Sequence, residues 1–287
     1  MRLIASLVYS NFFVAIVLSC LATSTFFIEV DLIFDWRLIV FIFLASFLLY
    51  SFHRIYKLDS IPLNLGGARH HWVKENYRTT LVAMTISLVG LFVLLPNLSP
   101  NTLFWLAPAA LISLGYTVPL IPYESKWIRI RDIPLVKPFV IALIVSYLTY
   151  SFPILDQRGS PGVLHSAHYA ALFERFLFLL IVTIPFEVRD MKSDKSAHLK
   201  TLATTLGSSN ATRLCYVLAF IWALMAILVS SFEPLRLAGI SAIFVLMVVA
   251  LFKLDRVKGE LGYALVFEGL IILYAGVYAT SSFFALP

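Results

Sequence analysis

The chain alternates long apolar runs with short polar segments from one end to the other. A helix that crosses the hydrocarbon core of a bilayer takes about 20 apolar residues, so each run predicts a membrane-spanning helix. We therefore expect an all-α polytopic membrane protein with nine transmembrane helices. Because the polar interruptions are short, residues 1–287 are expected to form one transmembrane domain. The nine runs lie near residues 3–28, 37–52, 79–96, 102–122, 138–155, 170–186, 212–231, 236–252 and 262–284.

Composition supports this class and excludes a soluble domain. Of the 287 residues, 60% are hydrophobic and 13% charged, and the mean hydropathy is +0.90; soluble domains are far more polar. The two cysteines, Cys20 and Cys215, both fall inside predicted spans and are interpreted as small packing residues. Nothing in their spacing indicates a disulfide framework or a zinc site.

The basic residues predict the orientation of the chain. If the N-terminus is cytoplasmic, 18 of the 22 Lys and Arg residues fall on the cytoplasmic side and only Arg37, Arg158, Arg175 and Arg236 on the other. Cytoplasmic loops are enriched in Lys and Arg, so this split places the N-terminus inside and the C-terminus on the opposite side. The net charge of +6 is then a signal of topology and gives no reason to expect nucleic-acid binding.

A cluster of acidic residues directly follows the sixth apolar run. At about 100° per residue, Glu187, Asp190 and Asp194 share an arc of roughly 60° on one face of a helix. Carboxylates that close repel one another unless a cation lies among them, and Mg²⁺ suits carboxylate oxygens together with ligand phosphates. The cluster therefore predicts a magnesium–diphosphate site at a membrane surface. The alternative is a solvated helix end whose acids are balanced by Arg189, Lys192 and Lys195.

Three other polar features lie near predicted helix ends. Residues 60–78 are rich in polar residues, Pro and Gly, and are long enough to fold over a site as a cap. In residues 126–132, cations such as Arg129 alternate with apolar residues, so the segment can contact an anionic ligand or anchor Trp127 at the lipid headgroups. Glu268 is the one acid that we place inside a span, where a charge is expensive and usually functional or paired.

The chain resembles the UbiA superfamily of intramembrane prenyltransferases. Nine spans, with polar segments after the second and sixth, match that family's topology. The specific part is 184–207, where Glu187 to Lys195, followed by Lys200-Thr201-Leu202 and Gly207, is similar to the family's second aspartate-rich motif. Weaker similarities are Tyr116-Thr117-Val118-Pro119-Leu120 and Glu268-Gly269-Leu270.

The resemblance implies a UbiA-like bundle with a central cavity open to the cytoplasmic side. It also implies transfer of a polyprenyl group from a polyprenyl diphosphate to an aromatic or other lipid-soluble acceptor, with Mg²⁺ as cofactor. Asp190 and Asp194 would be the catalytic metal ligands, with Glu187 as an accessory ligand. Further residues expected at the site are Arg189, Lys200 and Arg129 for the diphosphate, and Ser51, Tyr116 and Glu268 for the acceptor or isoprenoid pocket.

The first aspartate-rich motif of the family is degraded in this chain. Its Asn and its three Asp positions fall on Ser51, Phe52, Ile55 and Asp59 in that order, so only Asp59 remains as a metal ligand. Positive charge could replace a lost cation, and the candidates for contacting the diphosphate are Arg54, His53 and Lys57. Two alternatives follow: a family member that binds an isoprenoid diphosphate without turning it over, or an unrelated helical transporter whose acids form an ion site.

Overall fold

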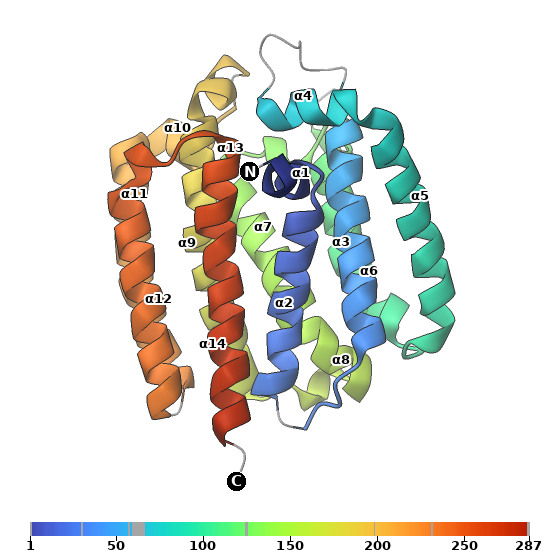
Figure 1. Ribbon diagram of the computed structural model, residues 1–287, viewed down its shortest axis with the longest axis vertical. Helices are drawn as coiled ribbons and strands as arrows, with labels where there is room; N and C mark the ends of the chain where they lie inside the picture. Colours follow the sequence, from blue (N-terminus) through green and yellow to red (C-terminus); the bar gives the residue numbers. More distant parts are fainter. Residues whose placement is uncertain are drawn as a thin grey trace.

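A computed structural model describes residues 2–29, 31–56, 58, 67–123, 126–197, 199–230 and 232–285. These residues form a helical bundle with one small antiparallel hairpin (Figure 1). The longer helices are α1 Arg2–Tyr9, α2 Phe12–Ile28, α3 Trp36–Tyr56, α4 Ala68–Glu75, α5 Tyr77–Leu94, α6 Thr102–Thr117, α7 Lys137–Ser146, α8 Phe152–Arg158, α9 Ser166–Ser196, α11 Ser208–Val229, α12 Pro234–Phe252 and α14 Gly269–Ala285. Shorter elements are η3 Leu95–Asn97, β1 Ile121–Tyr123, β2 Lys126–Ile128, η4 Ile130–Asp132, η5 Tyr147–Ser151, η6 Pro161–Val163, α10 Leu202–Leu206, η7 Leu254–Arg256, α13 Gly259–Tyr263 and η8 Ala264–Glu268.

The apolar runs become helices, and the prediction of a multi-pass helical membrane bundle is confirmed. Within the described part of the chain, six helices are long and apolar enough to cross a membrane. The pair α1 and α2, which meet at a 75° bend, adds a seventh. The predicted spans 102–122 and 170–186 coincide with α6 and with part of α9, which are not among those seven. The count of nine spans therefore stays a prediction.

Helix α9 forms the centre of the bundle. It packs against α7 and α11, and α14 packs against α2 on the neighbouring side (Figure 1). The side chains between them include Phe178, Trp222 and Tyr274, each at most 1% exposed. In contrast, α5 and α12 leave many large apolar side chains exposed, as expected for helices whose outer faces meet lipid tails.

A proline shapes the inner helix that follows α7. The turn η5 is π-helical and leads into α8, where Pro153 is the second residue. Proline has no N–H, so the carbonyl of Thr149, four residues earlier, loses its helical partner. That carbonyl accepts hydrogen bonds from Thr25 Oγ1 and from an Arg175 guanidinium nitrogen, both at 2.6 Å. The carbonyl that Pro153 leaves without a helical partner therefore connects η5 to α2 and α9 through hydrogen bonds.

Arg175 and its neighbour Glu174 form the centre of a buried polar network, here called the locking network. Besides the Thr149 carbonyl, Arg175 donates to Thr25 Oγ1 at 2.8 Å and to Ser24 Oγ at 3.2 Å. Glu174 accepts hydrogen bonds from the Trp222 indole at 2.5 Å and the Tyr274 hydroxyl at 2.6 Å. The locking network therefore joins α2, α9, α11 and α14 across the core.

The locking network corrects two statements made from the sequence. Arg175 was assigned to the non-cytoplasmic side, but it is 1% exposed and lies in the core, so it contributes to neither face. Glu268 was taken as the one acid inside a span, but Glu174 also lies within the run 170–186 and is 1% exposed. Glu174 and Arg175 are easily overlooked in the sequence because their neighbours along the chain are strongly apolar.

Candidate functional site

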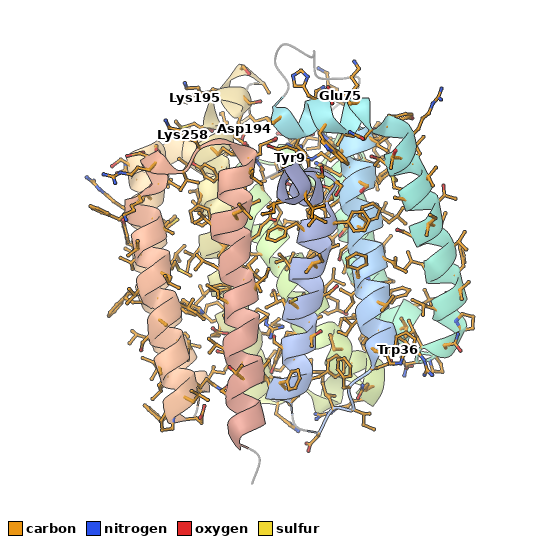
Figure 2. The ribbon with its side chains drawn as sticks, in the orientation of Figure 1. Tyr9, Trp36, Glu75, Asp194, Lys195 and Lys258 are labelled. Atoms are coloured by element: carbon orange, nitrogen blue, oxygen red, sulfur yellow. The ribbon has the colours of Figure 1, made fainter. Side chains whose placement is uncertain are left out.

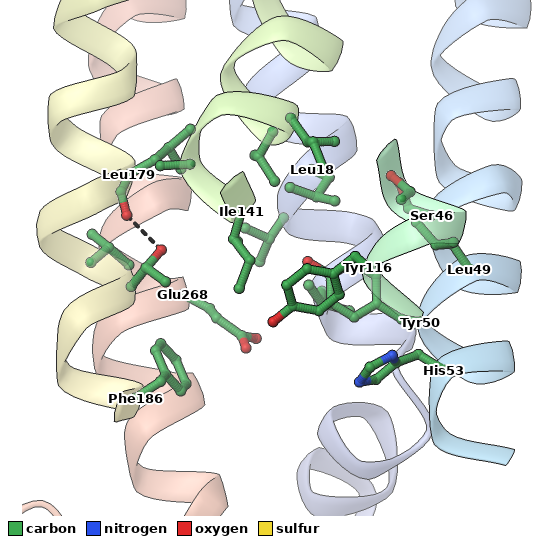
Figure 3. Close-up of a pocket in the computed structure, with 18 of the residues that line it drawn as sticks. Leu18, Ser46, Leu49, Tyr50, His53, Tyr116, Ile141, Leu179, Phe186 and Glu268 are labelled. Atoms are coloured by element: carbon green, nitrogen blue, oxygen red, sulfur yellow. Dashed lines mark hydrogen bonds between the residues drawn. The ribbon is translucent and has the colours of Figure 1, made fainter. Parts of the chain in front are cut away.

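A cavity of about 280 Å³ lies between α2, α3, α6, α7, α9 and the η8–α14 helix (Figure 3). We call it the pocket. Most of its wall is apolar, and several of the charged residues that line it, such as Arg54, Arg69 and Lys137, lie near the ends of helices. The apolar lining includes Val17, Leu18, Ile141, Val145, Leu148, Leu179, Val182 and Ile271. The charged and aromatic polar lining is Tyr50, His53, Arg54, Arg69, Tyr116, Lys137, Glu187, Arg189, Asp190 and Glu268.

Charged residues gather at the end of the bundle where α9 finishes. Figure 2 shows Asp194, Lys195, Lys258 and Glu75 at that end, with Trp36 at the opposite end. The cap expected from residues 60–78 is described only from Gly67 onward, where α4 lies across this end. Since α4 carries Arg69 and α9 carries Arg189 and Asp190, the pocket reaches the charged end of the molecule.

Arg69 is held over the pocket by a contact with α13. Its backbone N–H donates to Glu260 Oε2 at 2.6 Å. A Cβ added at Gly67 would lie 3.1 Å from the same carboxylate, so the backbone and Glu260 approach closely here. The Arg69 side chain is 8% exposed, and its Nε has no hydrogen-bond partner among the described residues. A buried guanidinium donor without a partner is costly, so this position suits an anionic ligand.

Glu187 is bound to the start of α10. Its Oε2 accepts hydrogen bonds from the backbone N–H groups of Leu202 at 3.0 Å and Ala203 at 3.4 Å. Burial raises the pKa of the Glu187 carboxyl, and the charge of Lys137 together with these backbone donors only partly offsets that effect. The second oxygen, Oε1, is buried and has no partner within the described ranges. Glu187 therefore has one oxygen available for a ligand.

Asp190 and Asp194 each lie beside a cation. Arg189 donates to both oxygens of Asp190, at 2.7 and 3.0 Å. Burial alone would raise the pKa of Asp190, but the hydrogen bonds and charge of Arg189, helped by Lys137, outweigh it, so the pKa of this carboxyl is lowered. Asp194 is 6% exposed and lies 3.4 Å from Lys137 Nζ. Asp190 lines the pocket, whereas Asp194 lies just outside its lining.

Helix α3 presents one face to the pocket, and this face differs from the one inferred from the sequence. Tyr50, His53 and Arg54 line the pocket, while Ser51 is fully buried on another side and accepts a hydrogen bond from Asn11 Nδ2 at 3.3 Å. The choice of Arg54 as a pocket residue thus agrees with the geometry, but the placement of Ser51 does not. Lys57 and Asp59, which were also expected at the site, lie outside the residues that the structure describes.

His53 holds an arginine in place. Its Nε2 lies 3.2 Å from an Arg131 guanidinium nitrogen and its Nδ1 lies 3.1 Å from Thr117 Oγ1. Arg131 can only donate, so this hydrogen-bond network assigns a neutral imidazole with its proton on Nδ1. Arg131 also lies over the ring of Tyr116, 5.7 Å from its centroid. The positive charge beside Tyr116 therefore comes from Arg131.

Two of the basic residues proposed from the sequence lie away from the pocket. Arg129 pairs with Asp132 through two hydrogen bonds of 2.8 Å, and that pairing lowers the pKa of Asp132 despite its partial burial. Lys200 is exposed. Two others were missed: Arg69 comes from the expected cap, and Lys137 directly precedes the fifth apolar run. Lys137 was counted only as a topology signal, although it contacts Asp194 and lines the pocket.

The carboxylates of α9 fit a Mg²⁺ ion that is shared with a phosphate ligand. Mg²⁺ is commonly bound by one or two protein carboxylates and completes its shell with waters and substrate phosphates. The described residues contain no group of three or more acidic, His or Cys side chains placed to hold a metal by themselves. Asp190 and Asp194 supply two carboxylates, and the unpartnered Oε1 of Glu187 supplies a further donor atom.

The arrangement defines a class of protein: a multi-pass helical membrane protein with an apolar pocket that ends in clustered cations and carboxylates. Comparison with known proteins agrees. The fold matches a UbiA homolog from Archaeoglobus fulgidus, solved with GPP and Mg²⁺ bound, with a TM-score of 0.57 and 15% identity over 96% of this chain and 99% of that one. It also matches digeranylgeranylglyceryl phosphate synthase, with a TM-score of 0.53 and 15% identity over 95% and 93% of the two chains.

The sequence comparison points the same way. The chain is 26% identical over 219 residues to a lycopene elongase/hydratase of Corynebacterium glutamicum, covering 74% of this chain and 71% of the relative. No protein-family model matches the sequence. The chain therefore has a UbiA-like fold, and the resemblance to the UbiA superfamily inferred from the sequence is confirmed at the level of the fold.

Proposed function

We propose that the protein is an intramembrane prenyltransferase that takes a polyprenyl group from a polyprenyl diphosphate and passes it to a lipid-soluble acceptor. One observation carries this proposal: the pocket joins a long apolar wall to an end lined by Arg54, Arg69, Lys137 and Arg189. An isoprenoid diphosphate has the same two parts, a hydrocarbon chain and a compact anionic head. The relatives support it, since the archaeal homolog was solved with GPP bound.

The side chains of the pocket suit the steps of such a transfer. Guanidinium groups make charge-assisted hydrogen bonds to phosphate oxygens, so Arg54, Arg69 and Arg189 would hold the diphosphate and offset the charge that develops as the carbon–oxygen bond breaks. Asp190 and Asp194 would hold Mg²⁺, which when bound neutralises charge on the departing diphosphate. The apolar wall would exclude water from the allylic cation until the acceptor reacts.

The same proposal assigns the orientation of the bundle. In the family resemblance the diphosphate site lies at the cytoplasmic side, which is also where the excess of Lys and Arg residues places the loops that follow the second and sixth runs. We therefore keep nine spans, a cytoplasmic N-terminus and a pocket that opens to the cytoplasm as parts of the proposal. The positions of α1 at one end of the bundle and the end of α14 at the other support an odd number of crossings (Figure 1).

The test is binding and turnover by the purified protein in detergent with Mg²⁺. Radiolabelled geranylgeranyl diphosphate should bind saturably and be displaced by inorganic pyrophosphate, and a mixed panel of aromatic and polyene acceptors should trigger pyrophosphate release. Lys258→Gln is a matched control, because Lys258 is exposed at the same end of the bundle but does not line the pocket. Absence of saturable diphosphate binding would overturn the proposal.

A second function is favoured by the pairing of the α9 acids. Asp190 is bound by Arg189 and Asp194 lies beside Lys137, while Phe52 and Ile55 occupy places where the family carries acids. This arrangement suits a protein that binds an isoprenoid diphosphate without consuming it. The same assay separates the two: binding without pyrophosphate release, across all acceptors, identifies a binding protein.

A further inference from the structure

Glu268 is the one acidic side chain of the pocket that belongs to neither the α9 cluster nor the locking network. It closes the π-helical turn η8, immediately before α14, and lines the pocket. Figure 3 shows its carboxylate directed toward the interior, on the same side as the hydroxyl of Tyr116. Single π-helical turns inside longer helices are frequent at functional sites, because the extra residue redirects the side chains of that turn.

One oxygen of Glu268 is buried and unpaired. Its Oε2 has no hydrogen-bond partner among the described residues. The Glu268 carboxylate interacts electrostatically with the nearby guanidinium groups of Arg69, Arg189 and Arg54. Its charge also acts on the hydroxyl of Tyr50. Within the described part of the chain, no hydrogen bond or ion pair like the one between Arg189 and Asp190 joins Glu268 to these residues. An unpaired buried carboxylate oxygen costs free energy that a ligand donor can recover.

Glu268 also marks the boundary between the two parts of the pocket. On one side lie the cations Arg54, Arg69 and Arg189. On the other side the apolar wall begins, with Ile271 one turn further along α14 and Val182 on the facing α9. If the diphosphate occupies the cationic end and the chain lies along the apolar wall, the carbon that joins them lies beside this boundary. The acceptor must reach that carbon, so it passes next to Glu268.

We propose that Glu268 is the residue that selects and activates the acceptor: its carboxylate receives the hydrogen bond of an acceptor O–H group. This inference rests on the proposed prenyl transfer. As the carbon–oxygen bond of the donor breaks, its electron pair leaves with the diphosphate. If the acceptor oxygen bonds to the allylic carbon, its hydroxyl proton passes to Glu268. If a ring carbon made electron-rich by that oxygen bonds instead, the hydroxyl proton again passes to Glu268, and the proton on that ring carbon then moves to the oxygen, which restores the aromatic ring. An acceptor without an O–H group lacks this contact.

The test uses a donor analogue that cannot react and a matched pair of acceptor probes. The protein is first loaded with the thiolodiphosphate analogue of geranylgeranyl diphosphate, whose binding is measured directly. Binding of 1-naphthol and of 1-methoxynaphthalene is then compared, since the two differ by the single donor group. We expect the naphthol to bind about tenfold more tightly or better, the gain typical of a hydrogen bond to a charged group. In Glu268→Leu the ratio of the affinities for 1-naphthol and 1-methoxynaphthalene should fall to about one.

Thr183→Val is the matched control. Thr183 lines the same pocket, but its hydroxyl already donates to the Leu179 carbonyl at 2.7 Å, so its loss should leave the preference unchanged. Turnover gives a second readout: Glu268→Gln, which keeps the shape but cannot take a proton, should lower kcat by about 100-fold with little change in KM for the diphosphate.

Three results would overturn the role of Glu268. The first is equal affinity for the naphthol and its ether in the unaltered protein, and the second is a preference that survives in Glu268→Leu. The third is loss of analogue binding in Glu268→Leu, which would make the residue a support for the arginines. Failure of the proposed function looks different, because the thiolodiphosphate analogue would then not bind to the unaltered protein.

Discussion

Two groups of buried charge lie in this bundle, and they differ in how their polar atoms are paired. In the locking network, both carboxylate oxygens of Glu174 and both terminal nitrogens of Arg175 have hydrogen-bond partners; only Arg175 Nε has none. In the pocket, Arg69 Nε, Glu187 Oε1 and Glu268 Oε2 are buried without partners among the described residues.

The difference separates structural charges from functional ones. Burying a charge costs several kcal/mol unless it is paired and hydrogen-bonded, and the locking network offsets most of that cost with groups from its own chain, although Arg175 Nε has no partner among the described residues. The pocket offsets less of this cost, because three of its buried polar atoms lack partners within the described part of the chain, and a bound ligand could supply them. Charges of the first kind should therefore control stability, and charges of the second kind binding and turnover.

The largest effect is expected for Asp190 in the pocket. Asp190→Asn removes a carboxylate that is proposed to hold Mg²⁺ while keeping the shape of the side chain, and pyrophosphate release should fall below detection, at least 100-fold. The melting temperature should change little because Asp190 lies at the end of α9 and its pair with Arg189 is partly exposed. Asp194→Asn should give the same loss of turnover. Retained turnover in both variants would remove the metal role assigned to these residues.

A large effect on stability, without a specific effect on the pocket, is expected for the locking network. Arg175→Met leaves the Thr149 carbonyl without its guanidinium donor and removes the positive charge that acts on the nearby Glu174 carboxylate, and leaving a buried charge uncompensated in this way costs about 3–5 kcal/mol. Unfolding in mixed detergent micelles measures it. The paired variant Glu174→Gln/Arg175→Met should recover part of the loss, while Glu268→Gln should cost nothing. Equal losses for Arg175→Met and Glu268→Gln would contradict the comparison.

A smaller effect on affinity is expected for Arg69. Arg69→Gln removes a charge-assisted contact to the diphosphate, which corresponds to about 10-fold to 100-fold weaker binding. Equilibrium binding of labelled geranylgeranyl diphosphate provides the measurement, with Lys258→Gln as the control at the same end of the bundle. The free energy of unfolding should stay constant or rise slightly, because the variant no longer buries an unpaired guanidinium nitrogen. Unchanged affinity would place the diphosphate elsewhere.

The smallest effect is expected from pH. The pKa of Asp190 is lowered in the folded protein, so its pairing with Arg189 stabilises the fold above the unfolded value of about 3.9. This contribution should be lost as pH falls below about 4 and through the lower folded value. Because the Asp190 side chain is 37% exposed, solvent screens the pair and the change should be small. Melting curves between pH 3 and 6 should show this loss, and Asp190→Asn should not.

The sequence was sufficient for the fold class and for part of the site. The helices follow from long apolar runs, which can be recognised in the sequence without any knowledge of tertiary contacts. The carboxylates Glu187, Asp190 and Asp194 stand out because they follow directly after such a run. Arg54 was selected because it lies near Ser51 on a helical wheel, but in the structure it lines the pocket together with Tyr50 and His53, and Ser51 contacts Asn11 instead.

The rest of the site depends on contacts between segments that are distant in sequence. Arg69 becomes a pocket residue because Glu260, 191 positions later, holds its backbone. Glu174 and Arg175 are invisible to a hydropathy average dominated by their neighbours, and Arg175 finds its acceptor only because Pro153 frees a carbonyl on another helix. Ser51 was misplaced because the sequence alone does not say which side of α3 packs against Asn11.

The π-helical turn before α14 has a consequence for how readily this pocket can change its chemistry. A regular helix would need one residue fewer over 264–268, and each residue rotates a helix by about 100°. Deletion of a single codon in this stretch would turn the acid away from the cavity while moving the rest of the helix by only about 1.5 Å along its axis. Related bundles can therefore gain or lose a carboxylate at this position through one small insertion or deletion, without rebuilding their framework.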